Sequence, residues 1–500
     1  MKKIFTIIAA VAALSLTSCK DYLDINHSPN SPEESQATVD MALPAAEMAL
    51  CARYGDLYRI IGGYLSEHYT QYFGTSNYLS YSQFYVSSGA TTNSYVDMNR
   101  AIANANFVMD KAKEQELWGT YLAATCIKVF TYQALIDAYG ETPYSEANQG
   151  KNNLSPKYDE GKDVYSGIIA ELNEALGKIN NPADYPVATN LLYNGEDATN
   201  WVKFGNALKL KLLMRVRAVS NVDAELTALV EEGNFPTDDV AWTCLNKNEK
   251  GKANPFYQEE FASYFGSTQK NCVLNVALYR TLSAVGDARL NKFFSVNSAA
   301  GAYWGSISGY NMSLSNNYKD SAFCRPNAKY DDPVYLISLS EIYFWLSEYY
   351  QKVKNDAVNA QDYYEAAIEA SFEGAGLSAA NAADVIAAYP YSAAKADEYI
   401  GIQKWVALSG FNSFEAWCEM RRLGYPTFGG KKAEDIYNFS TDTLDSSELE
   451  PGELYTPYQV NAQVGANKLP QRWLYPQASI DYNPNCPAEK QLTEKVFWAK

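Results

Sequence analysis

Apolar residues recur at intervals of three and four along much of the chain, which is the spacing of a helix that buries one face. In residues 163–178 this face includes Tyr165, Ile168, Leu172 and Ala175. The same rhythm predicts three further helices, over residues 201–219, 339–350 and 362–371. Most of the regular structure is therefore expected to be amphipathic helix.

Residues 121–139 are apolar on nearly every side, which predicts a deeply buried helix. Gly140 is expected to end it, and Pro143 prevents the helix from resuming. Evidence for strands is thin, since only residues 77–86 alternate loosely. Residues 301–318 are rich in Gly, Ser and Asn and predict a long loop.

Small alanines and aromatic residues on the predicted helix faces favour close contacts between neighbouring helices. No fixed repeat period is visible, and the W-x₂-L-G signature of tetratricopeptide repeats is absent. These patterns suggest tetratricopeptide-like layers of antiparallel helix pairs.

The N-terminus has the pattern of an export signal. Lys2 and Lys3 precede an apolar run over residues 4–16, too short to span a bilayer as a mature helix. Residues 16–19 read LTSC, which is typical of a bacterial lipobox and makes Cys19 the residue that carries the lipid. The alternative is an ordinary signal peptide in which Cys19 is incidental.

This pattern divides the chain into three parts. We expect residues 1–18 to be a lipoprotein signal peptide and residues 19–36, which are polar and contain two prolines, to be a lipidated tether. Residues 37–500 are expected to form a single helical domain. Several acyl chains on one cysteine suffice to hold such a domain on a membrane.

Charge and cysteine content narrow the function. The net charge of −17 disfavours nucleic acid as a partner, and no basic stripe offsets it. Seven cysteines besides Cys19 are scattered without a C-x-x-C pair, so they predict no disulfide framework. Cys126 and Cys418 lie beside apolar neighbours in helical patterns and are interpreted as small core residues.

Residues suited to catalysis are sparse. The chain has two histidines, His27 in the tether and His68, and neither has the spacing of a zinc ligand. Residues 374–379 match G-x-G-x-x-A, but no strand precedes them, so a helix-ending turn is expected. Glycoside hydrolysis needs a pair of carboxylates, and the sequence does not single out such a pair among its 58 acidic residues. We predict no enzyme activity and no cofactor, and the sequence leaves metal binding undecided.

Tyrosine is unusually abundant, with 40 residues, and many cluster in two regions. Tyrosine offers an apolar face and a hydroxyl, which suits ligands such as sugars, although helix packing also uses it. Residues 67–86 hold rings too dense for one buried stripe, and residues 303–310 place a Trp in a Gly/Ser/Asn-rich loop. The candidate ligand-binding residues are Tyr72, Asn77, Tyr78, Tyr81, Phe84, Tyr303, Trp304 and Tyr310.

Several segments, taken together, resemble one family, the SusD/RagB-type outer-membrane lipoproteins. The matching segments are residues 22–26 (YLDIN), 138–147 (AYGETPYSEA), 201–210 (WVKFGNALKL), 335–341 (YLISLSE), 403–408 (QKWVAL), 415–417 (EAW), 421–426 (RRLGYP) and 470–476 (PQRWLYP). Ala288 departs from the family's DPRL pattern, and Leu423 replaces its usual threonine. Most of these motifs belong to the scaffold, and Trp405, Trp417, Arg421 and Arg422 are interpreted as structural.

The resemblance implies an all-α fold in which a tetratricopeptide-like scaffold of helix pairs carries an irregular, loop-rich part for ligand binding. It implies a protein anchored on the outside of the outer membrane, where it acts as the lid of a SusC-like TonB-dependent transporter. Such a protein captures an oligosaccharide and passes it on without breaking bonds. It also implies that the N-terminal aromatic region contributes to the ligand site. The alternative is a helical-repeat surface lipoprotein that binds peptide, protein or glycopeptide ligands.

Overall fold

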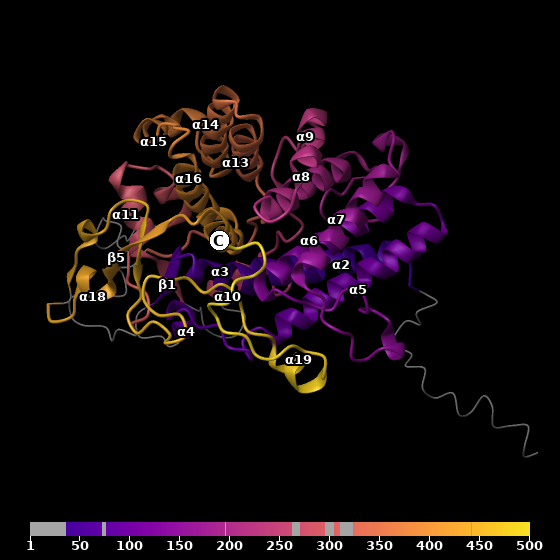
Figure 1. Ribbon diagram of the computed structural model, residues 1–500, viewed down its shortest axis with the longest axis horizontal. Coiled ribbons are helices and arrows are strands. Elements are labelled where there is room, and N and C mark those ends of the chain that lie inside the picture. The colour runs from indigo at the N-terminus through magenta and orange to yellow at the C-terminus, as the bar shows by residue number, and fades with distance from the viewer. Residues whose placement is uncertain are drawn as a thin grey trace, which may run out of the picture.

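Long helices dominate the chain in the computed structural model (Figure 1). The structure describes residues 37–72, 77–195, 197–262, 271–295, 305–310, 324–441 and 443–500. None of the described helices combines the length and the apolar character that crossing a membrane requires. The predicted signal peptide, tether and Cys19 lie outside the described residues.

The N-terminal half forms a stack of helices whose neighbours along the chain pack side by side. Its members are α2 (Val39–Arg53), α5 (Thr92–Glu114), α6 (Trp118–Tyr139), α7 (Gly161–Gly177) and α8 (Thr199–Val216). α5 packs on both α2 and α6, and α6 also contacts α7 and α8. α6 is buried on every side from Gly119 to Tyr139, and Gly140 follows it with a φ of +87°. The predicted central helix and its glycine end are confirmed.

A second group of helices extends from the top of Figure 1 toward its centre. It contains the pair α13 (Leu339–Tyr349) and α14 (Ala357–Gly374), followed by α16 (Ala396–Phe411) and α17 (Ser413–Leu423). A capping box between Ser338 and Glu341 starts α13. α13 contacts α8 and α16, and α17 contacts α3 (Arg59–Leu65), so this group packs on the N-terminal stack. The all-α prediction with paired helices is confirmed.

The strands are short and form two-stranded sheets in the described part of the chain. β1 (Tyr69–Gln71) pairs with β3 (Cys272–Leu274), and β2 (Val240–Trp242) with β4 (Val334–Ile337). β5 (Thr427–Lys432) pairs in parallel with β8 (Glu453–Thr456), and β6 (Tyr437–Asn438) with β7 (Thr443–Leu444). Together with the loops around them, β1 and β5 to β8 form the irregular part at the left of Figure 1.

Short helices link these elements. They are η2 (Tyr54–Tyr58), α4 (Leu79–Ser82), η3 (Gly150–Asn152), η4 (Pro182–Asp184), α9 (Asp223–Glu232), α10 (Pro255–Glu260), α11 (Val276–Ala284), α12 (Leu290–Phe293), η6 (Tyr350–Lys354), η7 (Ala379–Ala382), α15 (Ala383–Ala388), α18 (Ala433–Ile436), η8 (Ser446–Glu448) and α19 (Gln477–Tyr482).

Two local expectations differ from the structure. Residues 77–86, whose loose alternation hinted at a strand, form turns around the one-turn helix α4. Val219, expected on a buried helix face, follows the end of α8 and is 45% exposed. The helix-ending turn after α14 is confirmed, because Gly376 has a φ of +71° there. Cys126 and Cys418 are buried in the core, as expected.

A buried network of charges joins the two helix groups. Arg422 on α17 donates to both carboxylate oxygens of Glu348 on α13, at 2.8 and 2.7 Å. Lys404 on α16 lies 3.2 Å from Glu348 and 2.8 Å from Glu419, which also accepts from Arg215 on α8 at 2.7 Å. The interpretation of Arg422 as a structural residue is confirmed.

Arg421 and the two motif tryptophans are also structural. The guanidinium of Arg421 stacks 3.4 Å from the centre of the Trp417 ring and donates to the carbonyl of Gln471 at 2.7 Å. Trp417 Nε1 donates to Pro470 O at 3.0 Å, and Trp405 Nε1 donates to Ser66 O at 2.7 Å. These side chains attach the C-terminal segment and α3 to the helical scaffold.

Candidate ligand-binding surface

The first predicted aromatic region, residues 67–86, follows α3 and contains β1 and α4. Tyr78 precedes α4 with a left-handed φ of 61°, and its ring stacks on Tyr81 with centroids 5.3 Å apart. The buried ring of Tyr64 meets both with its edge, at 5.9 and 6.1 Å. Burial raises the pKa of Tyr81 to about 12, so its hydroxyl stays protonated at neutral pH. Tyr78 is half-buried.

The other candidates of this region differ in exposure. Asn77 is exposed beside Tyr78. Tyr72 is only 8% exposed, and its backbone N–H donates to Asn271 O at 2.8 Å. Phe84 has a φ of 62° and no exposed surface, because its ring packs in the hydrophobic core. In this conformation Asn77 and Tyr78 offer surface to a ligand, whereas Phe84 supports them from below.

The second predicted region packs directly on the first. Thr70 Oγ1 donates to Ile307 O at 3.0 Å, and the side chain of Gln71 donates to Tyr310 O. Gln83 Nε2 donates to Gly309 O at 3.3 Å. The structure thus brings together two segments that lie more than two hundred residues apart in the sequence. Tyr303 and Trp304 lie outside the described residues.

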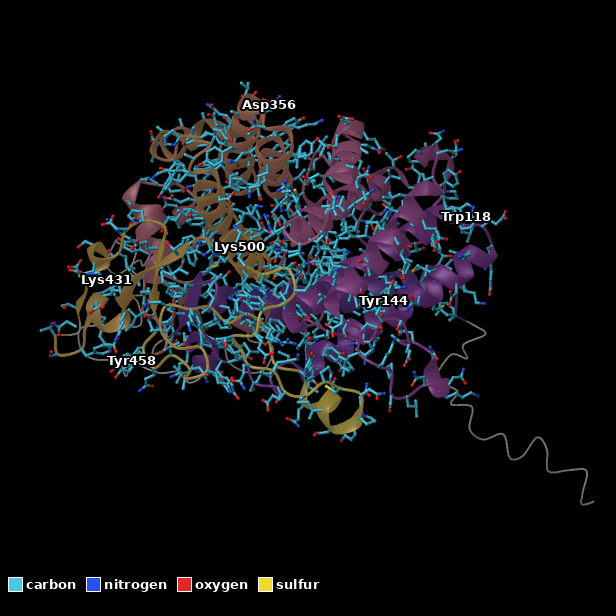
Figure 2. The ribbon with its side chains drawn as sticks, in the orientation of Figure 1. Trp118, Tyr144, Asp356, Lys431, Tyr458 and Lys500 are labelled. Atoms are coloured by element: carbon cyan, nitrogen blue, oxygen red, sulfur yellow. The ribbon has the colours of Figure 1, made fainter. Side chains whose placement is uncertain are left out.

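A third segment, which the sequence did not single out, completes this surface. Tyr458 N donates to Ser308 O at 2.8 Å, which places the Tyr458 ring 5.1 Å from the ring of Tyr310. Phe439, after β6, lies 4.8 Å from Tyr310 and 5.0 Å from Tyr458. All three rings are half-buried, and Tyr458 lies near the edge of the molecule in Figure 2.

Amide side chains border these rings. Gln83 Nε2 lies 3.3 Å from the side-chain oxygen of Gln459, and Gln459 is exposed. We call the rings of Tyr310, Phe439 and Tyr458, with the amides of Gln83 and Gln459, the aromatic surface. It combines flat apolar faces with hydrogen-bonding groups, the chemistry that fits a sugar ring and its hydroxyls. A ring next to Pro457 and close to Asn461 was the signal in the sequence that would have pointed to Tyr458.

His68 is held inside the scaffold. Its Nδ1 lies 3.0 Å from Ser413 Oγ and its Nε2 lies 2.9 Å from Trp405 O. Burial lowers the pKa of His68 to about 3, so the ring is neutral at physiological pH. Both nitrogens are occupied by partners within the scaffold, so His68 has a structural role.

One buried group of side chains has the donor types of a metal site. Oxygen and sulfur atoms of Asp137, Glu415 and Cys418 lie within 4.8 Å of one another. Arg215 forms ion pairs with both carboxylates, and Lys211 lies 3.0 Å from Glu415. These cations already balance the carboxylates, so the group belongs to the charge network of the core.

The sequence matches one protein family over most of its length. A SusD-like family, described as starch-binding and associating with the outer membrane, matches residues 55–441. The chain belongs to this SusD-like family. None of the curated protein sequences matches the chain.

Solved structures show the SusD-like fold over nearly the whole chain. A SusD homolog from Bacteroides uniformis has 20% sequence identity and a TM-score of 0.72, covering 93% of this chain and all of that one. A chitin-binding protein has 23% identity and a TM-score of 0.70, with 92% and 98% covered. A SusD-like protein from Bacteroides thetaiotaomicron has 18% identity and a TM-score of 0.70, with 92% and 99% covered.

The departures from the SusD-like motifs leave the local structure intact. Arg289, next to Ala288, is fully buried and its Nη2 donates to Asp287 at 2.6 Å. Leu423 is buried at the end of α17, where it packs with the second hydrophobic cluster of the core.

Proposed function

We propose that this SusD-like protein is a surface lipoprotein that binds oligosaccharides without cleaving them. The observation that carries this proposal is the aromatic surface, where the half-buried rings of Tyr310, Phe439 and Tyr458 meet beside the amides of Gln83 and Gln459. Aromatic faces pack against the C–H faces of sugars, and amides hydrogen-bond to hydroxyls. The family's description as starch-binding supports the same class of ligand.

The proposed binding site extends beyond the described residues. Asn77 and Tyr78 contribute from the side of α4, and Tyr303 and Trp304 would add rings next to residues 305–310. Tyr72, Tyr81 and Phe84 act mainly by holding these segments in place, since burial leaves them little free surface.

The binding test uses the purified chain and isothermal titration calorimetry. Maltooligosaccharides are the first probe because of the family description, and chitooligosaccharides the second because one structural neighbour is a chitin-binding protein. We expect saturable binding to one class of oligosaccharide. Binding to peptides alone, with no glycan in a broad panel bound, would support the peptide-binding alternative and overturn the proposal.

We further propose that Cys19 carries the lipid and that bound glycan passes to a TonB-dependent transporter of the outer membrane. The LTSC sequence and the family's association with the outer membrane support both steps. Radioactive palmitate should label the wild-type chain and leave Cys19→Ser unlabelled. A tagged chain should copurify a transporter from detergent-extracted outer membranes, and copurification of none would contradict the hand-over.

A further inference from the structure

A hollow of about 710 Å³ lies beside the C-terminal segment of the chain. Its walls come from the end of α17, the start of β5, residues 467–471 and residues 493–500. Lys500, in its wall, lies near the middle of the view in Figure 2, well away from Tyr458. A volume of this size lies within the range of sites for small molecules.

The charged side chains that line this hollow all carry positive charge. Arg421, Lys468, Lys495 and Lys500 line it, and its described lining contains no Asp or Glu. This concentration of cations contrasts with the net charge of −17 for the whole chain. A hollow lined by charges of one sign focuses the field and raises the local concentration of ions of opposite sign.

Two of these cations lack an internal counter-ion. Within the part of the chain that the structure describes, no carboxylate lies within ion-pair distance of Lys468 or Lys495. Lys500 Nζ donates to Leu423 O at 2.9 Å and lies 3.7 Å from Asp397, which belongs to a neighbouring hollow. The Arg421 guanidinium is held by Trp417 and by backbone carbonyls and adds a fixed positive charge.

The remaining lining suits a compact ring that carries hydroxyls. Phe428, Leu469 and Pro426 give the hollow apolar surface, and the hydroxyls of Thr427 and Thr493 lie on the same walls. A ligand that fits must therefore combine an anionic group with apolar C–H faces and hydroxyls. Sugars that carry a carboxylate or a sulfate group have this combination.

We propose that this hollow is a second binding site, which takes a monosaccharide-sized acidic sugar with a carboxylate or sulfate group. Lys468 and Lys495 bind the anionic group, and the apolar surface of Phe428 and Leu469 contacts the ring. The site is separate from the aromatic surface, so it stands or falls independently of the function proposed above.

The test measures binding of glucuronate, galactose 6-sulfate, glucose and inorganic sulfate to the full-length, detergent-solubilised protein. We expect the two acidic sugars to bind and glucose not to bind. The double variant Lys468→Gln/Lys495→Gln should weaken binding about tenfold, because each charge-assisted hydrogen bond is lost. Added salt should also weaken it, since the lysines are exposed.

A matched control variant loses the same two positive charges outside the hollow. The double variant Lys151→Gln/Lys247→Gln removes two exposed lysines, one in η3 and one after β2, that do not line the hollow, and it should bind like the wild type. Tyr458→Ala should likewise leave acidic-sugar binding unchanged. Equal loss in the control variant, inorganic sulfate binding as tightly as galactose 6-sulfate, or wild-type affinity in Lys468→Gln/Lys495→Gln would each overturn the proposal.

Discussion

Arg422 and Glu348 form a two-pronged ion pair between α17 and α13, with nitrogen–oxygen distances of 2.8 and 2.7 Å. Both side chains are buried, and Lys404 and Glu419 complete the group. Burial alone would raise the pKa of Glu348, but Arg422 and Lys404 lower it to about 2. Glu348 is therefore ionised inside the core and holds three helices together.

Replacing Glu348 by alanine is expected to destabilise the fold strongly. The change leaves the cations of Arg422 and Lys404 buried with less compensation, which costs about 3–5 kcal/mol for a buried pair. Urea unfolding followed by circular dichroism measures the free energy of unfolding.

The control for this variant is a surface pair. Lys431 lies 2.7 Å from Glu448, and both side chains are largely solvated, at 39% and 45% exposure. Glu448→Ala should change the free energy of unfolding by about 1 kcal/mol or less. Equal effects of Glu348→Ala and Glu448→Ala would contradict the role assigned to the buried network.

Glu47 on α2 predicts a pH dependence of stability. Its carboxylate accepts from the N–H groups of Leu191 and Leu192 at 2.7 and 3.0 Å, and burial raises its pKa from 4.5 to about 7. Between these values the folded chain holds a proton that the unfolded chain releases, so this group's contribution to stability falls as pH rises.

The variant Glu47→Gln removes that titration. Between about pH 4.5 and about pH 7.5, the wild type should lose on the order of 2–3 kcal/mol of unfolding free energy relative to the variant. Titrations shared by both proteins, such as that of Asp56, cancel in the comparison. A difference that stays constant over this range would show that Glu47 is ionised in the folded state.

The sequence predicted the helical scaffold well because burial there follows helical periodicity. In α7, Tyr165, Ile168 and Leu172 are buried at the expected spacing. The sequence of α6 has no polar face, and the helix is buried on every side, as predicted. Arg422 was predicted to be structural but its partners were not, since spacing along one helix does not reveal that Arg422 meets Glu348 on another.

The contacts that form the candidate ligand-binding surface were predicted less completely. Residues 67–86 and 303–310 were found because rings in Gly- and Asn-rich segments are poorly explained by helix packing. Phe439 and Tyr458 were missed, because their proximity to Tyr310 depends on backbone contacts between distant loops. Ring density also does not separate a half-buried Tyr78 from a fully buried Phe84.

Gly62 tests the close approach of α3 to α17. A Cβ atom at this position would collide with the backbone of Phe414 and Ser413. We expect Gly62→Ala to lower the free energy of unfolding by about 3 kcal/mol, because neither backbone can move without breaking its helix. Gly177→Ala, at the open end of α7, is the control and should be neutral or stabilising by about 0.5–1 kcal/mol. Similar stabilities of the two variants would contradict this account.

Substitutions of Tyr458 and Phe84 are expected to affect different properties: Tyr458 contributes to oligosaccharide binding and Phe84 to stability. Tyr458 is half-buried and its ring meets Tyr310 and Phe439, so Tyr458→Ala should weaken oligosaccharide binding about five- to tenfold, with a small effect on stability. Phe84 is fully buried, so Phe84→Ala should destabilise the chain by about 3–5 kcal/mol. Calorimetric titration with the bound oligosaccharide measures affinity, and urea unfolding measures stability, for each variant.

Tyr482→Ala is the control for loss of any surface tyrosine, because it removes an 80% exposed ring from α19. It should leave both affinity and stability unchanged. If Tyr458→Ala and Tyr482→Ala bind equally well, the aromatic surface is not where the glycan binds.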